Sequence, residues 1–409
     1  MITSITYSSN LLHRLMTQPF DTLAHQLQPY YSRFDVANRL LFTGHSHQAW
    51  PDAAFEGMHE YETMVARDVD QKWGPAAEKT EVLRNYLRHF YDDPTGFWCR
   101  EQNTHVLMVS WLSALDLTQK PVILTTTGEF HSMSRQLRSL GKAGLEIVIL
   151  DHSDDERLLN SIRSQLNERV SAVMLSRIYF QTAEIQTRLT EIAAVCRQAG
   201  VPLMIDDYHG TNVVPLSIRD AGLDDCYLLI GGYKYLQWGE ANCFLRFPKN
   251  CTLTPVITGW FAAFGSLDQP KDRHRIDFDE GDQKFATATY DPVSQFRAAA
   301  VVRFFEEQGL TPEVLASQYR SQVQFLGDLF DEMNVSGSGI TRAHARPPEQ
   351  TGGFLSLRSD RAREIRATLL ARGVYTDARN DLLRIGPAPY TTSNQCKEMM
   401  EALFEVIRP

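Results

Sequence analysis

Short apolar runs and longer amphipathic stretches alternate along the chain from about residue 102 to about residue 250. Each apolar run is long enough for a buried strand, and each amphipathic stretch is long enough for a helix with one face in the core. The expected strands cover residues 121–127, 145–151, 171–177, 201–207, 224–232 and 243–248, and the expected helices cover residues 129–144, 155–170 and 189–200. This alternation predicts an α/β domain whose mainly parallel sheet is covered by helices on both faces.

The pattern changes near residue 292. A long helical stretch at 292–309 is followed by strand and helix signals at 352–359, 363–373, 374–379 and 382–390 and by a terminal helix. These signals predict a smaller α+β domain. We therefore expect an N-terminal segment (1–55) that packs with the small domain, a large domain (56–292) and a small C-terminal domain (293–409).

Composition and charge narrow the class of protein. The chain has 409 residues, of which 43% are hydrophobic and 22% charged, and its net charge is −9. These values are typical of a soluble globular protein, and the negative charge gives no long-range attraction for nucleic acid or anionic membranes. The first 20 residues lack the apolar stretch of a secretory signal, and no window resembles a membrane span. We expect a cytoplasmic protein.

The six cysteines are dispersed and show no CxxC spacing. This spacing predicts neither a zinc ribbon nor a disulfide framework, so we interpret most of them as core residues.

Two strand ends carry the residues with the clearest chemistry. The run "VPLMIDDYHGTN" (201–212) ends in Asp206, Asp207 and His209, and the next strand run leads into "GGYKY", which places Lys234 28 residues after Asp206. Ligands of open α/β sheets bind at the carboxyl ends of strands. A desolvated lysine is a nucleophilic amine that can form a Schiff base, and pyridoxal phosphate (PLP) also needs a carboxylate on its pyridine nitrogen. Lys234 and Asp206 fit these two roles.

Three weaker signals point the same way. Asn103 or Thr104 can cap a helix whose free N–H groups would hold a phosphate, and Phe130 follows a strand where its ring can stack on a pyridine. Arg384 stands before a Gly-Pro-Ala-Pro turn and provides a fork for a carboxylate. Taken singly, a helix cap, a core phenylalanine and a surface arginine are the more common explanations of these residues.

These motifs, in this order, resemble kynureninase and the class V aminotransferase group of PLP enzymes with the type I fold, from about residue 38 to the C-terminus. The resemblance implies a large domain with a mainly parallel seven-stranded sheet and a homodimer with cofactor sites near the interface. It also implies that Lys234 carries the cofactor, that Asp206 holds the pyridine nitrogen and that His209 lies close to the ring. These three residues are the expected catalytic group.

The resemblance also implies a wider set of contacts. Arg384 matches the arginine that binds the substrate α-carboxylate. Residues expected at the cofactor are Tyr233, Ser176, Thr104, His105, Phe130, Trp260 and Tyr290, of which Trp260 and Tyr290 belong to segments that reach a neighbouring subunit's cofactor in the family.

Several segments depart from the family pattern. The family's G-N-S-L-G stretch is "GHSHQAW" (44–50), and its F-P-S-D is "FHSM", which removes an aspartate at Met133. We interpret His45, His47 and His131, which lie in these segments, as substrate-binding residues for a polar or anionic side chain. Hydrogen bonding within loops is the competing interpretation.

The sequence therefore predicts a PLP-dependent enzyme for an α-amino acid, with kynureninase-like hydrolysis of the Cβ–Cγ bond that releases alanine and with an altered substrate pocket. A class V aminotransferase and a β-eliminating C–S lyase are the alternatives. Persulfide chemistry ranks low because Cys396 falls inside the predicted terminal helix. A metal enzyme built on His45, His47, Asp206 and His209 is a remote alternative.

Overall fold

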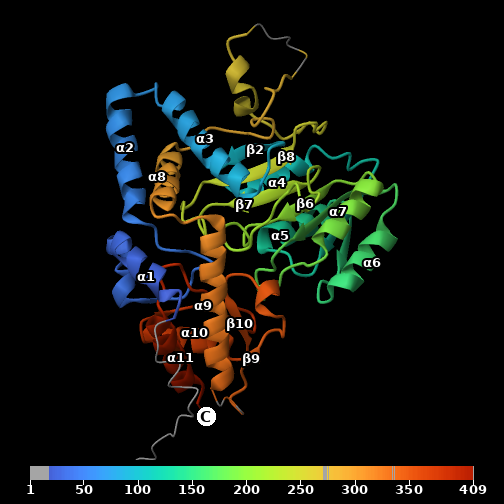
Figure 1. Cartoon of the computed structure of the whole chain (residues 1–409). Coiled ribbons are helices and arrows are strands. Elements are labelled where there is room, and N and C mark those ends of the chain that lie inside the picture. The colour runs from blue at the N-terminus through green and yellow to red at the C-terminus, as the bar shows by residue number, and fades with distance from the viewer. Residues whose placement is uncertain (1–17, 270–273, 275, 334, 336, 409) are drawn as a thin grey trace, which may run out of the picture.

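The computed structural model describes residues 18–269, 274, 276–333, 335 and 337–408, so the expectation drawn from the extreme N-terminus falls largely outside the described residues. Its centre is a seven-stranded sheet in the order β2-β8-β7-β6-β5-β3-β4 (Figure 1). The strands are β2 (Gly96–Glu101), β3 (Val122–Thr126), β4 (Glu146–Leu150), β5 (Val170–Ser176), β6 (Leu203–Asp206), β7 (Tyr227–Gly231) and β8 (Cys243–Pro248).

Five neighbouring strands of this sheet, from β4 to β7, are parallel, and β8 pairs antiparallel with both β7 and the edge strand β2. The expected mainly parallel seven-stranded α/β sheet is therefore confirmed. In its register Ser176 pairs with Asp206, and Asp206 pairs with Leu229. The carboxyl ends of β5, β6 and β7 thus lie side by side.

Alternate residues of each strand face two different hydrophobic clusters. Leu124, Val173 and Ile205 belong to the cluster that includes residues of α3 (Trp73–Phe90), α6 (Asp155–Gln165), α7 (Leu189–Gln198) and α8 (Val293–Glu307). Ile123 and Met204 belong to the cluster that includes residues of α4 (Thr104–Leu112) and α5 (His131–Lys142). Successive side chains of a strand point to opposite faces. Both faces of the sheet are therefore covered, as the apolar runs predict.

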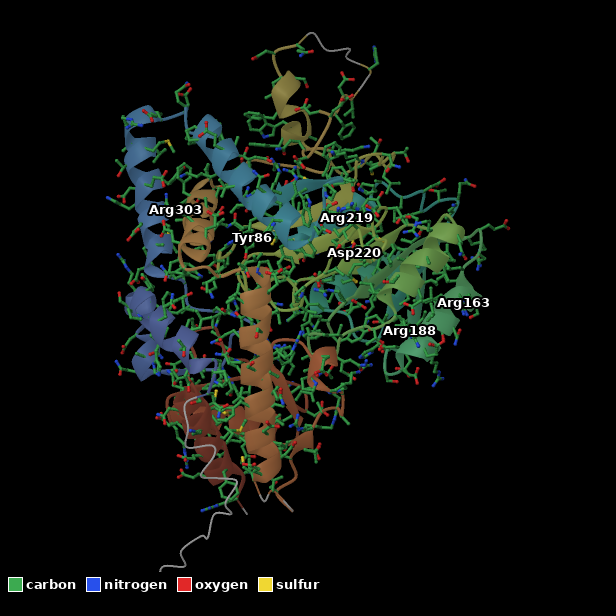
Figure 2. The ribbon with its side chains drawn as sticks, in the orientation of Figure 1. Tyr86, Arg163, Arg188, Arg219, Asp220 and Arg303 are labelled. Carbon is green, nitrogen blue, oxygen red and sulfur yellow. The ribbon has the colours of Figure 1, made fainter. Side chains whose placement is uncertain are left out.

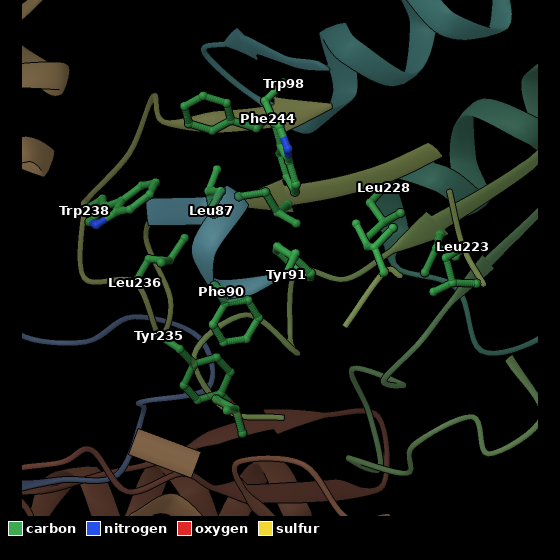
Figure 3. Close-up of a cluster of buried hydrophobic side chains, with 14 of the residues drawn as sticks. Leu87, Phe90, Tyr91, Trp98, Leu223, Leu228, Tyr235, Leu236, Trp238 and Phe244 are labelled. Carbon is green, nitrogen blue, oxygen red and sulfur yellow. The ribbon is translucent and has the colours of Figure 1, made fainter. Parts of the chain in front are cut away.

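The first cluster extends beneath the segment that follows β7. Figure 3 shows Tyr235, Leu236 and Trp238 beside Leu87 and Phe90 of α3. The residues after Lys234 are thus fixed in the core.

The C-terminal part forms a second layer, drawn in orange and red in Figure 1. A four-stranded antiparallel sheet, β12-β13-β10-β9, shares a hydrophobic cluster with three helices. These elements are β9 (Thr341–Arg342), β10 (Leu355–Arg358), β12 (Asp377–Arg379), β13 (Leu382–Ile385), α9 (Pro312–Glu332), α10 (Ala362–Ala371) and α11 (Ser393–Ile407). The predicted combination of strands and helices is confirmed, and the domain boundaries stay a prediction.

The N-terminal part joins both layers. It contains α1 (Asp21–Leu27), β1 (Leu40–Leu41), α2 (Asp52–Asp68) and short 3₁₀ helices at Gln28–Phe34 and Val36–Asn38. Two further 3₁₀ helices lie later in the chain, at Trp260–Ser266 and Pro348–Gln350. β1 pairs in parallel with β11 (Val374–Tyr375), and the Gly44 N–H donates to the carbonyl of Gly386. The segment around β1 and Gly44 is therefore held against the C-terminal layer.

The surface carries many charges. In Figure 2 the labelled Arg163 and Arg188 extend outward from the side of the molecule formed by α6 and α7. Within the described part of the chain, no helix combines the length and the apolar character needed to cross a membrane. All six cysteines are free thiols, and all except Cys251 are buried, in agreement with the interpretation as core residues.

Candidate active site

A cavity of about 370 Å³ opens at the carboxyl ends of β5, β6 and β7. This is the edge of an α/β sheet at which ligands bind. The cavity brings together eight residues that the sequence predicted: Thr104, His105, Phe130, Ser176, Asp206, His209, Tyr233 and Lys234.

The amine of Lys234 lies deep in this cavity. The residue is 4% exposed, and its Nζ is 2.9 Å from Nε2 of His209 and 4.4 Å from the centre of the Tyr208 ring. Burial lowers the pKa of Lys234 to about 7, and the positive charges of Arg384 and Arg379 act in the same direction, whereas the charge of Asp206 opposes the shift. A large share of the amine is therefore neutral and nucleophilic at neutral pH.

Asp206 and His209 flank this amine. The Tyr208 N–H donates to Oδ1 of Asp206 at 3.0 Å, and burial raises the pKa of the Asp206 carboxyl. Burial and the charges of Lys234 and Arg384 hold the pKa of His209 well below its usual value, so this imidazole is neutral. A neutral imidazole can accept a hydrogen bond from the amine.

The helix α4 begins at the rim of the cavity. Oδ1 of Asn103 accepts a hydrogen bond from the Val106 N–H at 3.0 Å, which confirms the expected N-cap. Thr104 and His105 form the first turn, where unpaired N–H groups favour an anion. The exposed carboxylate of Glu240 also lines the cavity and opposes an anion close to it.

Ser176 is supported by a buried carboxyl that is not among the predicted site residues. The Ser176 Oγ donates to Oε2 of Glu129 at 2.7 Å, and the Thr126 Oγ1 donates to Oε1 at 2.5 Å. Burial, aided by the charge of Asp206, raises the pKa of Glu129 to about 7. A glutamate next to a predicted stacking phenylalanine was the available signal, and Phe130 does line the cavity, 5.3 Å from the Lys234 Nζ.

Arg384 stands behind the cavity wall. It is 3% exposed, and its Nη1 donates to the carbonyl of Phe180, a lining residue, at 2.5 Å. Its Nη2 forms an ion pair with Asp377, and its Nε is buried without a partner within the described residues. The guanidinium group of Arg384 is therefore already paired on one side with a carboxylate of the chain itself, that of Asp377.

The three histidines of the departing segments lie in different places. His45 is fully buried, and its Nε2 is 3.8 Å from Oδ2 of Asp377, while His47 is exposed and stacks on Tyr233 at 4.8 Å between ring centres. His131 lies beside Phe180, with 5.2 Å between ring centres. None of the three is a lining residue of the cavity, and their substrate roles stay predictions. Among the described residues no group of three or more His, Cys, Asp or Glu side chains has a metal-binding arrangement, so the metal alternative gains no ligand set.

Trp260 and Tyr290 lie away from the cavity in this chain. Trp260 is 44% exposed and donates through Nε1 to Oγ1 of Thr289 at 3.2 Å. Tyr290 packs against Trp73 and Phe261. Their expected cofactor contacts stay predictions that depend on a second subunit.

Two further lining residues were not foreseen. Tyr208 is one of them, and its ring fits because residue 231 is glycine: a Cβ there would lie 1.9 Å from Cζ of Tyr208. Cys243 also lines the cavity, 3.9 Å from the Tyr208 hydroxyl, and burial raises the pKa of its thiol to about 11. A thiol in this state is a poor nucleophile.

Together these residues fit PLP. A buried amine of lowered pKa, a carboxyl group at a strand end, an aromatic ring and a helix N-terminus border one cavity, which is the set of groups that this cofactor requires.

Comparison with known proteins points to the same class. Residues 320–403 match the family model of the kynureninase C-terminal domain. The kynureninase of Xanthomonas euvesicatoria pv. vesicatoria (strain 85-10) is 24% identical over 308 residues, which cover 70% of this chain and 70% of that protein. A relative described as an uncharacterized aminotransferase, YcbU of Bacillus subtilis (strain 168), is 21% identical over 337 residues, 82% of this chain and 85% of its own. The chain is a kynureninase-like, class V aminotransferase-like protein.

Solved structures agree on the fold of this kynureninase-like protein. A structure of C-DES with glycine covalently linked to the PLP cofactor has a TM-score of 0.77 at 18% identity and covers 93% of this chain and 99% of its own. The cysteine desulfurase CsdA from Escherichia coli has a TM-score of 0.77 at 14% identity and covers 94% and 98%. The type I fold is confirmed, and the relatives named above and the PLP cofactor of the C-DES structure agree with the expected enzyme class and cofactor.

Proposed function

We propose that this protein uses PLP, anchored on Lys234, to act on an α-amino acid. The observation that carries the proposal is the buried Lys234 amine, which lies 2.9 Å from a neutral His209 and shares one cavity with Asp206. When bound, PLP supplies an electron sink for negative charge that develops at the substrate Cα.

Each neighbouring residue has a role in this proposal. Asp206 keeps the pyridine nitrogen protonated, Phe130 stacks on the ring, and the first turn of α4 at Thr104 holds the phosphate. Arg384 orients the substrate carboxylate through its unpaired Nε. The Lys234 amine, neutral in part at pH 7, then removes the α-proton, and His209 accepts a hydrogen bond from it.

For the reaction itself we propose kynureninase-like hydrolysis. Water cleaves the Cβ–Cγ bond, an acyl group leaves as a carboxylic acid, and the remaining three carbons are released as alanine. The match of residues 320–403 to the kynureninase C-terminal domain supports this choice. Elimination at Cβ and transamination use the same proton removal and are separated from hydrolysis by their products.

An absorbance experiment tests the anchor. Purified protein is incubated with PLP, passed through a desalting column, and then treated with borohydride before peptide mapping. Wild type should keep a visible absorbance band, and the pyridoxyl mass should lie on the peptide that contains Lys234. The Lys234→Ala variant should show neither, while Lys142→Ala, which changes an exposed lysine of α5, should behave as wild type.

Equal retention of the band by wild type and the Lys234→Ala variant would contradict the anchor. Product analysis then decides the reaction: alanine indicates hydrolysis, pyruvate indicates elimination, and a keto acid with the substrate skeleton indicates transamination.

We further propose that the enzyme is a homodimer. Val256, Ile257, Trp260 and Leu267 are exposed apolar residues of the segment between β8 and α8, and Figure 1 shows part of this segment projecting from the molecule. Exposed apolar groups of this kind mark interaction surfaces. Sedimentation of wild type should give twice the monomer mass, and a Trp260→Asp variant should shift toward monomer; a monomeric wild type would contradict this proposal.

A further inference from the structure

Two guanidinium groups contact one carboxylate beside the active-site cavity. Asp377 of β12 lies opposite Arg384 of β13 in the sheet register, and the two form an ion pair. On its other side, Oδ1 of Asp377 accepts a hydrogen bond from Nη1 of Arg379 at 2.8 Å. One carboxylate thus bridges two arginines, and positive charge is left over.

This cluster borders the cavity at Phe180. The Phe180 carbonyl accepts a hydrogen bond from Arg384, and the His131 ring lies 5.2 Å from the Phe180 ring. The charge of Arg379 acts on a residue on each side of Phe180, namely Lys234 and His131. Burial is the largest cause that lowers the pKa of Lys234 inside the cavity and the pKa of His131 outside it, and the charge of Arg379 lowers both pKa values further.

Donors in the cluster remain free within the described residues. Arg384 has a buried Nε without a partner, and Arg379, whose side chain is 41% exposed, makes hydrogen bonds only through Nη1. Arg135 of α5, whose charge also lowers the pKa of His131, forms no ion pair with any described residue. His131 is neutral at pH 7 and adds a hydrogen-bond donor without adding charge.

The balance of charge exceeds what a single substrate carboxylate neutralises. One α-carboxylate on Arg384 leaves the charges of Arg379 and Arg135, which both act on His131, and among the described residues only Asp377 is paired with either of these two arginines. In a chain of net charge −9, a local excess of positive charge at a cavity favours an anionic ligand.

We propose that the substrate is an α-amino acid whose side chain ends in a second carboxylate, and that Arg379, assisted by His131, binds that carboxylate. The inference rests on the proposed function for the place of the α-carboxylate at Arg384. It makes Arg379 a specificity-determining residue and distinguishes this site from one for a neutral aromatic side chain.

Binding of non-reacting acids tests the inference. Isothermal titration calorimetry of PLP-loaded, full-length protein compares succinate, with two carboxylates, with butyrate, which has the same number of carbons and one. Succinate should bind at least about tenfold more tightly, as expected for one additional charge-assisted arginine contact. The Arg379→Gln variant should bind both acids with similar affinity, and Arg384→Gln should bind both more weakly.

Two controls guard the result. Arg363→Gln changes an exposed arginine of α10 and should keep the preference for succinate. Arg379→Lys keeps a charge next to Asp377 and should keep part of the preference, so the test stands even where loss of the charge disturbs folding.

The inference and the proposed function fail in different ways. Equal affinity of wild type for succinate and butyrate, or an unchanged preference in Arg379→Gln, overturns the inference while the cofactor band persists. Absence of the cofactor band overturns the role of Lys234. The same titration on cofactor-free protein, in which Arg379 is still present, should again favour succinate.

Discussion

Nζ of Lys234 lies 2.9 Å from Nε2 of His209, and neither group carries a full positive charge at neutral pH. Because burial lowers the pKa of Lys234 to about 7, we expect its acylation by an amine reagent in the cofactor-free protein to rise with pH around a midpoint near 7. Arg384→Gln removes a charge that lowers this pKa and should move the midpoint upward, and Asp206→Asn should move it downward. Mass spectrometry of the Lys234 peptide measures the extent of acylation at each pH and gives the midpoint. A midpoint near 10 in wild type would contradict the expectation.

Glu129 should make stability depend on pH. Its folded pKa is raised from 4.5 to about 7 by burial, aided by the charge of Asp206, so between these values the folded state binds more protons than the unfolded state. Its contribution is full below about pH 4.5 and is lost as pH rises toward 7. Glu129→Gln keeps the shape without titrating. Urea unfolding from pH 4.5 to 7.5 should show a smaller fall in stability for the variant than for wild type, and parallel curves would refute the idea.

The buried pair Arg177–Asp207 should contribute to stability next to the cavity. Arg177 Nε donates to Oδ1 of Asp207 at 2.6 Å, and the Tyr91 hydroxyl donates to Oδ2 at 2.7 Å. Arg177→Met would leave Asp207 as a buried carboxylate without its cation, at a cost of about 3 to 5 kcal/mol in the free energy of unfolding. Denaturant unfolding measures this. The exposed pair Arg361–Glu364 is the control, and Arg361→Met should leave the unfolding curve unchanged.

Gly231 should be intolerant of a side chain. A Cβ at this position would lie 1.9 Å from Cζ of Tyr208, whose ring covers the Lys234 amine. Gly231→Ala should therefore displace Tyr208 and lower PLP affinity by at least about tenfold, measured by absorbance titration. Gly74→Ala in α3, where a Cβ meets no atom within 4 Å, is the matched control and should bind PLP as wild type does. Normal binding by Gly231→Ala would refute the role of this contact.

The fold was largely predictable from the sequence because its strands are buried on both faces. The runs 201–205 and 226–230 are continuously apolar and are followed within four residues by Asp206 and Lys234, which identifies both the strand and its carboxyl end. The positions of Lys234 and Asp206 could be predicted from the sequence for the same reason. They follow adjacent strands, so the sheet brings them to one cavity.

Other parts of the site depend on contacts that no local pattern encodes. In the sequence nothing distinguishes Asp377 from other acidic residues. Its role depends on the pairing of β12 with β13, which places it opposite Arg384. The burial of Glu129 arises from packing against Ser176, 47 residues away in the chain. The positions of His45 and His47, two residues apart, differ because one points into the C-terminal layer and the other stacks on Tyr233.

The pairing of β1 with β11 also constrains how the protein is made. Leu40 cannot pair until Val374 has been synthesised, so the layer that contains Arg384 is incomplete until translation has passed that residue. Long-range pairing of this kind closes late because the intervening chain must first be ordered. The strands that present Lys234 and Asp206, in contrast, are all synthesised by residue 248. A nascent chain therefore has Lys234 and Asp206 before it has Arg384, the proposed substrate arginine, and cofactor uptake can precede completion of the proposed substrate site.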